Sequence, residues 1–206
     1  MRYVAMSLVL VAIIHLMGCS RPTDAPAGPA SEQPPAPSSD SDTASPPGAT
    51  TAQPSAPVAQ VRVVDENQFQ AVLDELKGKV VLIDFWGTWC APCLELLPHT
   101  LEAADKYGPQ GLVVVAVAID DPDDVNGVEE KLAQRGGYVI PLLSKYGVSS
   151  ESVEKFGISD GALPHLKLLD RSGKIVETFG VGGSRPDPEN IDAAIERTLA
   201  SSPATS

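Results

Sequence analysis

Apolar residues from about residue 60 onward follow patterns that predict alternating strands and helices. The runs at 79–85 and 112–119 are almost continuously apolar and rich in Val and Ile, which is typical of strands buried on both faces of a sheet. We expect a helix at 66–76 with Asp65 as its N-cap, and further helices at 91–107, 125–134, 149–156 and 191–199. We also expect short strands at 61–64 and 138–143, and a hairpin over 161–176 with its turn at Gly173. The pattern therefore predicts an α/β domain over residues 59–200.

The first 18 residues form a separate, short apolar segment. The run from Val4 to Met17 follows a single base, Arg2, and is too short for a comfortable membrane span, so it predicts a signal peptide. It ends in Leu16-Met17-Gly18-Cys19, which resembles a bacterial lipobox. The resemblance implies cleavage before Cys19 and a lipid on Cys19 that anchors the protein in a membrane. The alternative is an ordinary signal peptide, or an uncleaved anchor with an incidental cysteine.

Residues 19–58 are rich in Pro, Ala, Ser and Thr. Between residues 20 and 57 the chain has no aromatic side chain and no Val, Leu, Ile or Met, so this segment cannot bury enough apolar surface to offset the entropy of ordering. We expect a disordered tether that reaches on the order of 100 Å when fully extended. Such a tether would hold the domain off a membrane.

The chain is acidic. Its 206 residues carry 27 Asp and Glu against 15 Lys and Arg, which gives a formal net charge of −12. Nucleic-acid binding needs a basic surface, so this charge argues against that class of function, and its simplest meaning is solubility. The run Asp120-Asp121-Pro122-Asp123-Asp124 lacks the spacing of a calcium loop. We interpret it as a solvated loop that caps the next helix.

Two of the three cysteines stand at a predicted junction between a strand and a helix. Cys90 directly precedes helix 91–107, whose free N–H groups and dipole favour a negative charge. The pKa of the Cys90 thiol should therefore lie below its ordinary value. Cys93 lies one turn later on the same side of the helix, close enough to close a disulfide. With Cys19 expected to carry lipid, these two residues are the only redox pair.

Closely spaced cysteines also occur in structural disulfides and in zinc sites. The loop between Cys90 and Cys93 is very short, so a disulfide there would stabilise the fold little by chain entropy. A zinc site needs a second pair of Cys or His residues with ligand spacing, which the sequence lacks. We expect no metal, and interpret Cys90 as an attacking thiolate and Cys93 as the thiol that resolves the mixed disulfide.

The stretch Trp86-Gly87-Thr88-Trp89-Cys90-Ala91-Pro92-Cys93 after an apolar strand resembles the thioredoxin-fold signature. It is most similar to the TlpA/ResA family of membrane-tethered extracytoplasmic thioredoxins. The resemblance covers roughly residues 60–200. It implies a thioredoxin fold, in which helices flank a central mixed β-sheet and a TlpA/ResA-type helical insertion precedes the strand after Pro164.

The same resemblance implies a function. It indicates a thiol–disulfide oxidoreductase that needs no cofactor and works on the periplasmic side of a bacterial membrane. Its partners would be disulfide-bearing client proteins and a membrane electron donor of the DsbD/CcdA kind. The dipeptide Ala91-Pro92 between the cysteines is similar to the Gly-Pro of thioredoxin, which favours a reductant over an oxidant.

The resemblance also assigns roles to residues outside the cysteine pair. Asp84 is an acid within an apolar run and matches the buried carboxylate of cytoplasmic thioredoxins, so it should accept the proton of Cys93. The alternative is a carboxylate satisfied by a backbone or lysine partner. Pro164 matches the cis-proline of the family, and with Leu163 and Trp89 it should form the substrate-binding surface.

Several polar residues near these positions are interpreted as structural. His165 could tune the thiolate, but we expect an ordinary strand residue, and we expect His99 on a helix surface. The family often has a Glu six residues after its first cysteine, where this chain has Leu96. Glu95 is one residue earlier, so it should point about 100° away around the helix and act as a surface charge.

Two other activities are known on the same fold. A copper-binding or metallochaperone module of the Sco type uses Cys-x-x-x-Cys with a distant His, whereas only two residues separate Cys90 from Cys93. A peroxide-reducing redoxin needs Pro-x-x-x-Thr/Ser-x-x-Cys, which is absent around Cys90. Disulfide reduction is therefore the preferred interpretation.

Overall fold

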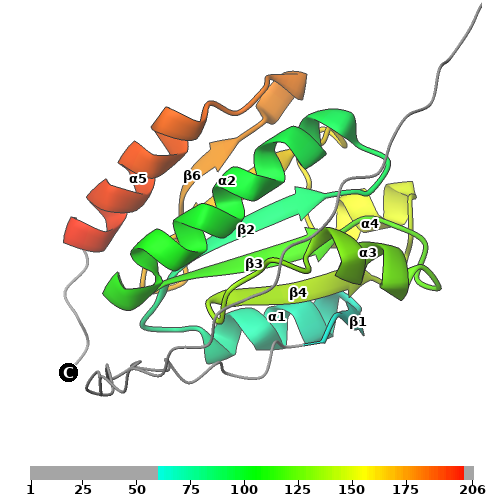
Figure 1. Cartoon of the computed structure of the whole chain (residues 1–206), viewed down its shortest axis with the longest axis horizontal. Helices are drawn as coiled ribbons and strands as arrows, with labels where there is room; N and C mark the ends of the chain where they lie inside the picture. The colour runs from blue at the N-terminus through cyan, green and yellow to red at the C-terminus, as the bar shows by residue number, and fades with distance from the viewer. Residues whose placement is uncertain (1–59, 202–206) are drawn as a thin grey trace, which may run out of the picture. The chain divides into compact units, whose positions relative to one another are not determined.

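The computed structural model describes residues 60–201, which form a mixed sheet with helices on both faces (Figure 1). The strands are β1 (Arg62–Val64), β2 (Val80–Trp86), β3 (Leu112–Ala118), β4 (Val139–Ser144), β5 (His165–Leu169) and β6 (Ile175–Phe179). The helices are α1 (Glu66–Glu75), α2 (Ala91–Tyr107), α3 (Val125–Lys131), α4 (Ser150–Lys155) and α5 (Pro188–Ser201), with short 3-10 turns η1 (Gly108–Gln110) and η2 (Val181–Gly183). The predicted signal peptide, 1–18, and tether, 19–58, lie outside the described residues.

The strands lie in the order β1-β4-β3-β2-β5-β6. Strand β2 pairs in parallel with β3 and antiparallel with β5, so that Asp84 stands between Ala116 and Leu166. Every residue of β2 is buried, as expected for a central strand with both faces covered. The predicted central mixed sheet is confirmed.

The two faces of the sheet carry separate cores. Successive side chains of a strand point to opposite faces, so Leu82 and Trp86 join the core formed with α2, α3 and α5. Ile83 and Phe85 join the other core, which α1 and α4 cover. Asp84 follows the alternation of Leu82 and Trp86, so its carboxyl group faces α2. The pleat of one strand thus decides which residues can lie near the cysteines.

Helix α1 begins as its sequence predicts. The Asp65 carboxylate accepts hydrogen bonds from the backbone N–H groups of Asn67 and Gln68, at 3.0 and 2.9 Å. The Gln68 side chain accepts from the Asp65 N–H at 3.0 Å, which completes a capping box. These bonds satisfy N–H groups that the first turn of a helix leaves unpaired. The predicted N-cap role of Asp65 is confirmed.

Two helices have an end three residues away from the predicted one, whereas the bounds of the other three agree to within one residue. Helix α3 ends at Lys131 rather than Gln134, and the Arg135 guanidinium donates to the Leu132 carbonyl at 2.8 Å in the turn that follows. Helix α5 begins at Pro188, before the predicted start at residue 191. Its first turn carries no large apolar residue, so the hydrophobic pattern does not reveal it.

The predicted insertion folds as α3, β4 and α4, between β3 and the strand that follows Pro164. Its strand joins the sheet, because β4 pairs in parallel with β3 on one side and with β1 on the other. The remaining helix, α4, packs on the same face as α1. The insertion therefore widens the sheet by one strand. It also places the turn between β4 and α4 at the end of the sheet where β2 leads into α2 (Figure 1).

Three phenylalanines join α1 and α4 to the sheet. The ring centroid of Phe69 lies 5.2 Å from that of Phe156, edge to face, and 6.1 Å from that of Phe85. Truncating a buried Phe loses both its transfer free energy and its packing contacts. We therefore expect Phe69→Ala to lower the free energy of unfolding by about 3–5 kcal/mol in urea denaturation.

Gln70 provides the matched control, because it lies next to Phe69 on α1 but is exposed. Gln70→Ala should change the free energy of unfolding by less than about 0.5 kcal/mol. Equal losses in the two variants would show that the aromatic cluster does not hold α1 on the sheet.

Candidate active site

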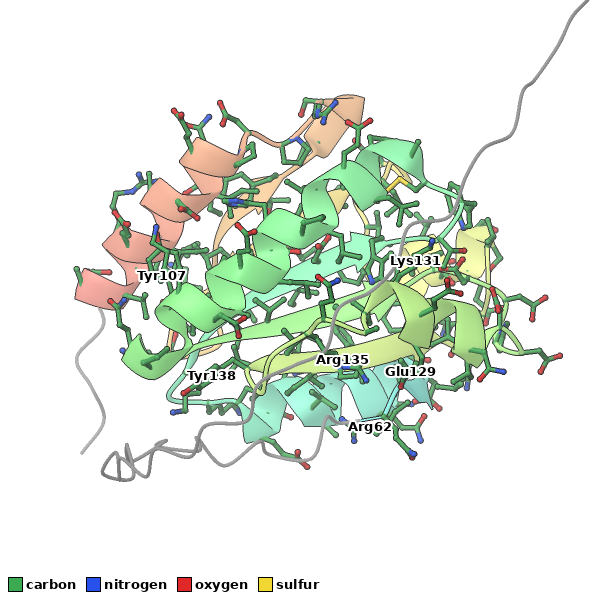
Figure 2. The ribbon with its side chains drawn as sticks, in the orientation of Figure 1. Arg62, Tyr107, Glu129, Lys131, Arg135 and Tyr138 are labelled. Carbon is green, nitrogen blue, oxygen red and sulfur yellow. A yellow bond between two sulfur atoms is a disulfide. The ribbon has the colours of Figure 1, made fainter. Side chains whose placement is uncertain are left out.

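The two cysteines lie where β2 passes into α2. Cys90 is the N-cap residue of α2, and its Sγ accepts a hydrogen bond from the Cys93 N–H at 3.3 Å. The two sulfur atoms form a disulfide at 2.02 Å, with the Cα atoms 5.2 Å apart (Figure 2). Cys90 is 5% exposed and Cys93 is 1% exposed. Of the two sulfurs, that of Cys90 therefore belongs to the residue closer to solvent, and it stands at the positive end of the helix dipole.

The redox loop, residues 87–90, joins β2 to α2 and is hydrogen-bonded to the residues that follow β3. The Thr88 N–H lies 3.1 Å from both carboxylate oxygens of Asp120, and the Thr88 hydroxyl donates to Asp120 Oδ1 at 2.5 Å. The Trp89 indole N–H donates to the Ile119 carbonyl at 2.9 Å. Backbone and side chains of the redox loop are thus held by two consecutive residues that follow a buried strand.

Asp120 corrects one sequence interpretation. The acidic run was expected to be a solvated loop, but Asp120 is only 3% exposed and serves the redox loop. Asp124 does cap the next helix as predicted, because its carboxylate accepts from the Gly127 N–H at 3.1 Å. The difference is that Asp120 is the first polar residue after β3, so its side chain is still covered by the sheet and the redox loop.

The predicted substrate-binding residues meet beside this loop. The Leu163–Pro164 peptide bond is cis, as expected. In the sheet, His165 pairs with Phe85, so the start of β5 lies beside the end of β2 and Pro164 is close to the redox loop. Trp89 and Leu163 line the same pocket, and Trp89 is 55% exposed whereas Trp86 is fully buried. Trp89 therefore lies at the surface, as predicted, whereas Trp86 belongs to the core.

Asp84 is buried beneath α2. It is 2% exposed, its Oδ2 lies 2.9 Å from the Thr100 hydroxyl, and its Oδ1 has no hydrogen-bond partner among the described residues. Burial raises the pKa of the Asp84 carboxyl to about 7, although the hydrogen bond with Thr100 opposes the shift. Asp84 can therefore exchange a proton near neutral pH, which fits a proton acceptor better than a permanent ion.

Thr100, like Asp120, has a role that sequence reasoning missed. Its hydroxyl oxygen lies 2.9 Å from both Asp84 Oδ2 and the Leu97 carbonyl. A hydroxyl has one proton, so it cannot donate to both at once. When it donates to Leu97, a protonated Asp84 can donate to Thr100 instead. The signal was its place seven residues after Cys93 on the same buried face of α2.

His165 does not face the cysteines. Its partner across the strand pair is Phe85, on the face covered by α1 and α4, and the two ring centroids are 6.1 Å apart. Both ring nitrogens are buried without a partner among the described residues, and burial lowers the pKa of the imidazole. His165 is thus a strand residue, as interpreted, and α2 lies on the opposite side of the sheet.

Two polar residues of α2, His99 and Glu95, lie at the surface of the helix. His99 Nε2 is 3.2 Å from Asp192 Oδ1 of α5, and both side chains are about a quarter exposed. Glu95 is exposed and pairs with Arg185, whereas Leu96 is buried. The one-residue offset between Glu95 and Leu96 therefore turns the carboxylate away from the core, as predicted.

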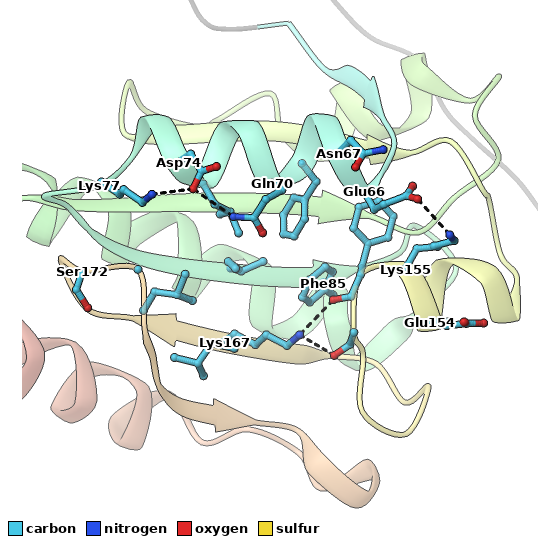
Figure 3. Close-up of a pocket in the computed structure, with 18 residues that line it drawn as sticks. Glu66, Asn67, Gln70, Asp74, Lys77, Phe85, Glu154, Lys155, Lys167 and Ser172 are labelled. Carbon is cyan, nitrogen blue, oxygen red and sulfur yellow. Dashed lines mark hydrogen bonds and ion pairs between the residues drawn. The ribbon is translucent and has the colours of Figure 1, made fainter.

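A hollow on the face of the sheet covered by α1 is lined by neither cysteine and is larger than the pocket lined by Trp89 and Leu163. It has a volume of about 530 Å³ between α1, α4 and β5, and Phe85 lies at its floor (Figure 3). Lys167, which lines this hollow, donates hydrogen bonds to the carbonyls of Phe156 and Gly157, at 3.1 and 2.6 Å. These carbonyls end α4, so Lys167 satisfies a helix end. Figure 3 also shows the ion pairs of Asp74 with Lys77 and of Glu66 with Lys155 at the rim of this hollow.

No group of three or more metal-ligating side chains occurs within residues 60–201. In the same part of the chain, none of the helices combines the length and apolar character needed to cross a membrane. Cys19, the predicted lipidation site, lies outside the described residues, so its modification stays a prediction.

Comparison with known proteins agrees with this geometry. Residues 51–195 match the Redoxin family model. Thiol-disulfide oxidoreductase ResA of Bacillus thuringiensis (strain Al Hakam) is 33% identical over 105 residues, which cover 51% of this chain and 57% of the relative. ResA of Geobacillus thermodenitrificans (strain NG80-2) is 34% identical over 103 residues, covering 50% and 55%. The chain thus spans little more than half the length of these relatives.

A crystal structure of a Chlorobium tepidum protein, described as thiol:disulfide interchange protein DsbE, is also similar. It has 29% sequence identity and a TM-score of 0.50, over 62% of this chain and 84% of the other. These likenesses support the thioredoxin fold that the order and directions of the strands indicate. Since the Redoxin match extends over well over half of its length, the chain belongs to the Redoxin family.

Proposed function

We propose that the protein is an extracytoplasmic thiol–disulfide oxidoreductase that reduces disulfides in partner proteins. The observation that carries the proposal is the Cys90–Cys93 pair at the N-terminus of α2, with Cys90 as the cap residue. The free N–H groups of the first turn stabilise a thiolate at this position. The ResA relatives support the same activity, since their names state it.

The reaction transfers two electrons from the dithiol to the client. The Cys90 thiolate attacks one sulfur of the client disulfide, so a new bond joins Cys90 to the client and the other client sulfur leaves as a thiolate. Cys93 then loses its proton and attacks Cys90, which releases the second client thiol and leaves the Cys90–Cys93 disulfide. A membrane electron donor of the DsbD/CcdA kind would restore the dithiol.

Asp84 is proposed as the acceptor of the Cys93 proton. Its carboxyl is buried on the α2 side of the sheet, and its pKa of about 7 leaves it partly ionised at neutral pH. Cys93 and Thr100, the hydrogen-bond partner of Asp84, share the buried face of α2. Ionised Asp84 has an oxygen without a partner among the described residues, which can receive a proton directly or through water.

Substitution of the resolving cysteine tests the function and its direction. In Cys93→Ala, attack by Cys90 should stop at the mixed disulfide, because no second thiol is present to release the client. We expect covalent adducts that disappear on treatment with dithiothreitol, found by non-reducing electrophoresis and mass spectrometry. Purified wild-type protein with dithiothreitol should reduce insulin, and Cys93→Ala should not turn over.

Cys90→Ala is the matched control for trapping. It retains Cys93, which is 1% exposed, so it should trap no client. Adducts in Cys90→Ala and none in Cys93→Ala would mean that the two cysteines have the opposite roles. Absence of insulin reduction by the wild-type protein would contradict the proposed activity itself.

Asp84→Asn tests the proton acceptor. The rate of mixed-disulfide resolution in the wild-type protein should rise between pH 6 and 8, as Asp84 ionises with a pKa of about 7. Asn has a similar shape and can still bond to Thr100, but it accepts no proton. We expect resolution roughly tenfold slower or more at pH 8, measured by stopped-flow release of a client peptide. An unchanged rate would remove Asp84 from the mechanism.

The same variant has a stability signature that checks the pKa. The carboxyl binds a proton more tightly in the folded protein, so folding is favoured most below the ordinary pKa of Asp. This contribution is lost as pH rises to about 7, by a total on the order of 4 kcal/mol. Asp84→Asn should lack this fall in urea denaturation. A wild-type protein with the same pH dependence as the variant would contradict the buried carboxylic acid.

The proposed location rests on Cys19 and on the tether of residues 19–58. A lipid-modified Cys19 with two or more acyl chains would anchor the protein stably, whereas one chain binds only marginally. The extended tether would let the domain reach clients and an electron donor at a distance from the anchor.

Cys19→Ala should release the protein from its membrane. Wild-type protein should partition into the detergent phase of Triton X-114, and mass spectrometry should find acyl chains on Cys19. Cys19→Ala should move to the aqueous phase or stay unprocessed, while Cys90→Ala, which changes a cysteine of the domain, should partition as the wild type does. Unmodified Cys19 in a mature, membrane-bound protein would contradict lipid anchoring.

A further inference from the structure

A pocket of about 300 Å³ opens directly beside the redox loop. Its apolar lining comes from Trp89 and Ile119, from Leu163, and from the insertion, which contributes Val148, Val153 and Ile158. The remaining lining residues are serines and a glycine, so no charged residue contributes to the wall. In a chain with a net charge of −12, this is a neutral and largely apolar site.

The pocket carries the most exposed large apolar side chains of the described residues. Val148 is 63% exposed and Trp89 is 55% exposed, ahead of every other large apolar residue between 60 and 201. The polar atom of Trp89 is already used, because its indole N–H donates to Ile119. The ring therefore offers an apolar surface, and with Val148 beside the same pocket it forms an exposed apolar area of the kind found at interaction sites.

The wall made by the insertion is held in place by buried hydrogen bonds. The Ser152 hydroxyl donates to the Gly147 carbonyl at 2.6 Å and lies 2.7 Å from the Ser144 hydroxyl. The Ser149 hydroxyl accepts from the Ser152 N–H at 3.3 Å and caps α4. Val148 lies between Gly147 and Ser149, which are both hydrogen-bonded to Ser152. The turn therefore holds the exposed Val148 side chain in a fixed position. A preformed wall loses little entropy when a ligand binds.

The pocket is continuous with the site of reaction. Trp89 immediately precedes Cys90, and Leu163 immediately precedes Pro164. A client that brings its sulfur to Cys90, which is 5% exposed, must therefore place the neighbouring part of its chain over these residues. Residues 20–57 and 202–206 contain no aromatic or large aliphatic side chain, so neither of these two segments supplies a group that could fill the pocket.

We propose that this pocket binds a large apolar side chain of the client, close in sequence to the cysteine that Cys90 attacks. The inference rests on the proposed function and adds a substrate preference to it. A volume of about 300 Å³ lies at the lower end of ligand pockets and suits one large side chain rather than a cofactor. A charged side chain would lose its hydration there and gain no partner. Val148 is thus a specificity residue supplied by the insertion.

Peptide disulfides test this preference. Each peptide has one cysteine joined to glutathione, with Phe at one of the two positions before or after it and Gly at the others. The reduced protein is oxidised to its Cys90–Cys93 disulfide, and each substrate disulfide becomes a peptide thiol and glutathione. We expect at least one Phe position to react about tenfold faster than the all-Gly peptide, as measured by glutathione release. Equal rates for all peptides would overturn the proposal.

Variants at Val148 locate the preference. Val148→Glu and Val148→Lys should both bring the rates of the Phe and Gly peptides to within about twofold of each other, since either charge would oppose an apolar side chain. Val176→Glu is the matched control, because Val176 is 46% exposed on β6 and does not line the pocket. It should keep the full Phe preference. A preference that survives in either Val148 variant would overturn the proposal.

Glutathione disulfide separates this inference from the proposed function. It carries no large apolar side chain, so the wild-type protein should reduce it without use of the pocket. If no disulfide substrate is reduced at all, the proposed activity is wrong. If glutathione disulfide and the Gly peptide are reduced but Phe confers no advantage, only the role of the pocket is wrong.

Discussion

The attachment of the redox loop to the end of β3 is the constraint on which the site depends. Asp120 and Ile119 bind Thr88 and Trp89, and so decide where α2 begins relative to the sheet. Cys90 then becomes the cap of α2, with its sulfur among the free N–H groups of the first turn. Because Trp89 is held by its indole N–H, the same contacts that position the cysteine also fix the apolar surface beside it.

Successive side chains of β2 point to opposite faces of the sheet, and this alternation decides which residues lie near the cysteines. Asp84 and Trp86 face α2, whereas Phe85 faces α1 and α4. His165 pairs with Phe85 and therefore lies on the side of the sheet away from α2, although it follows the cis-proline directly. Asp84 instead shares its face with Cys93 and Thr100, and burial there raises its pKa to about 7. Whether a residue lies near the cysteines therefore depends on which face of the sheet its side chain occupies, and not on how close it is to the cysteines or the cis-proline in sequence.

The insertion supplies one wall of the pocket beside the cysteines. Its strand β4 lies between β3 and β1, so the segment that follows is delivered to the end of the sheet where the cysteines lie. The turn before α4 then presents Val148 next to Trp89 and Leu163. Because β4 is part of the sheet, the turn that follows it lies next to the cysteines and forms one wall of the pocket.

The sequence by itself determined the elements whose physical cause is local. The apolar runs indicated β2 and β3, Asp65 marked the start of α1, and the spacing of Cys90 and Cys93 after a strand indicated a redox pair. Only the tertiary structure decided that Asp120 is buried, that Thr100 meets Asp84, and that Val148 borders the pocket with Trp89. These contacts join residues distant in sequence, and no local pattern specifies them because they depend on how the strands are ordered in the sheet.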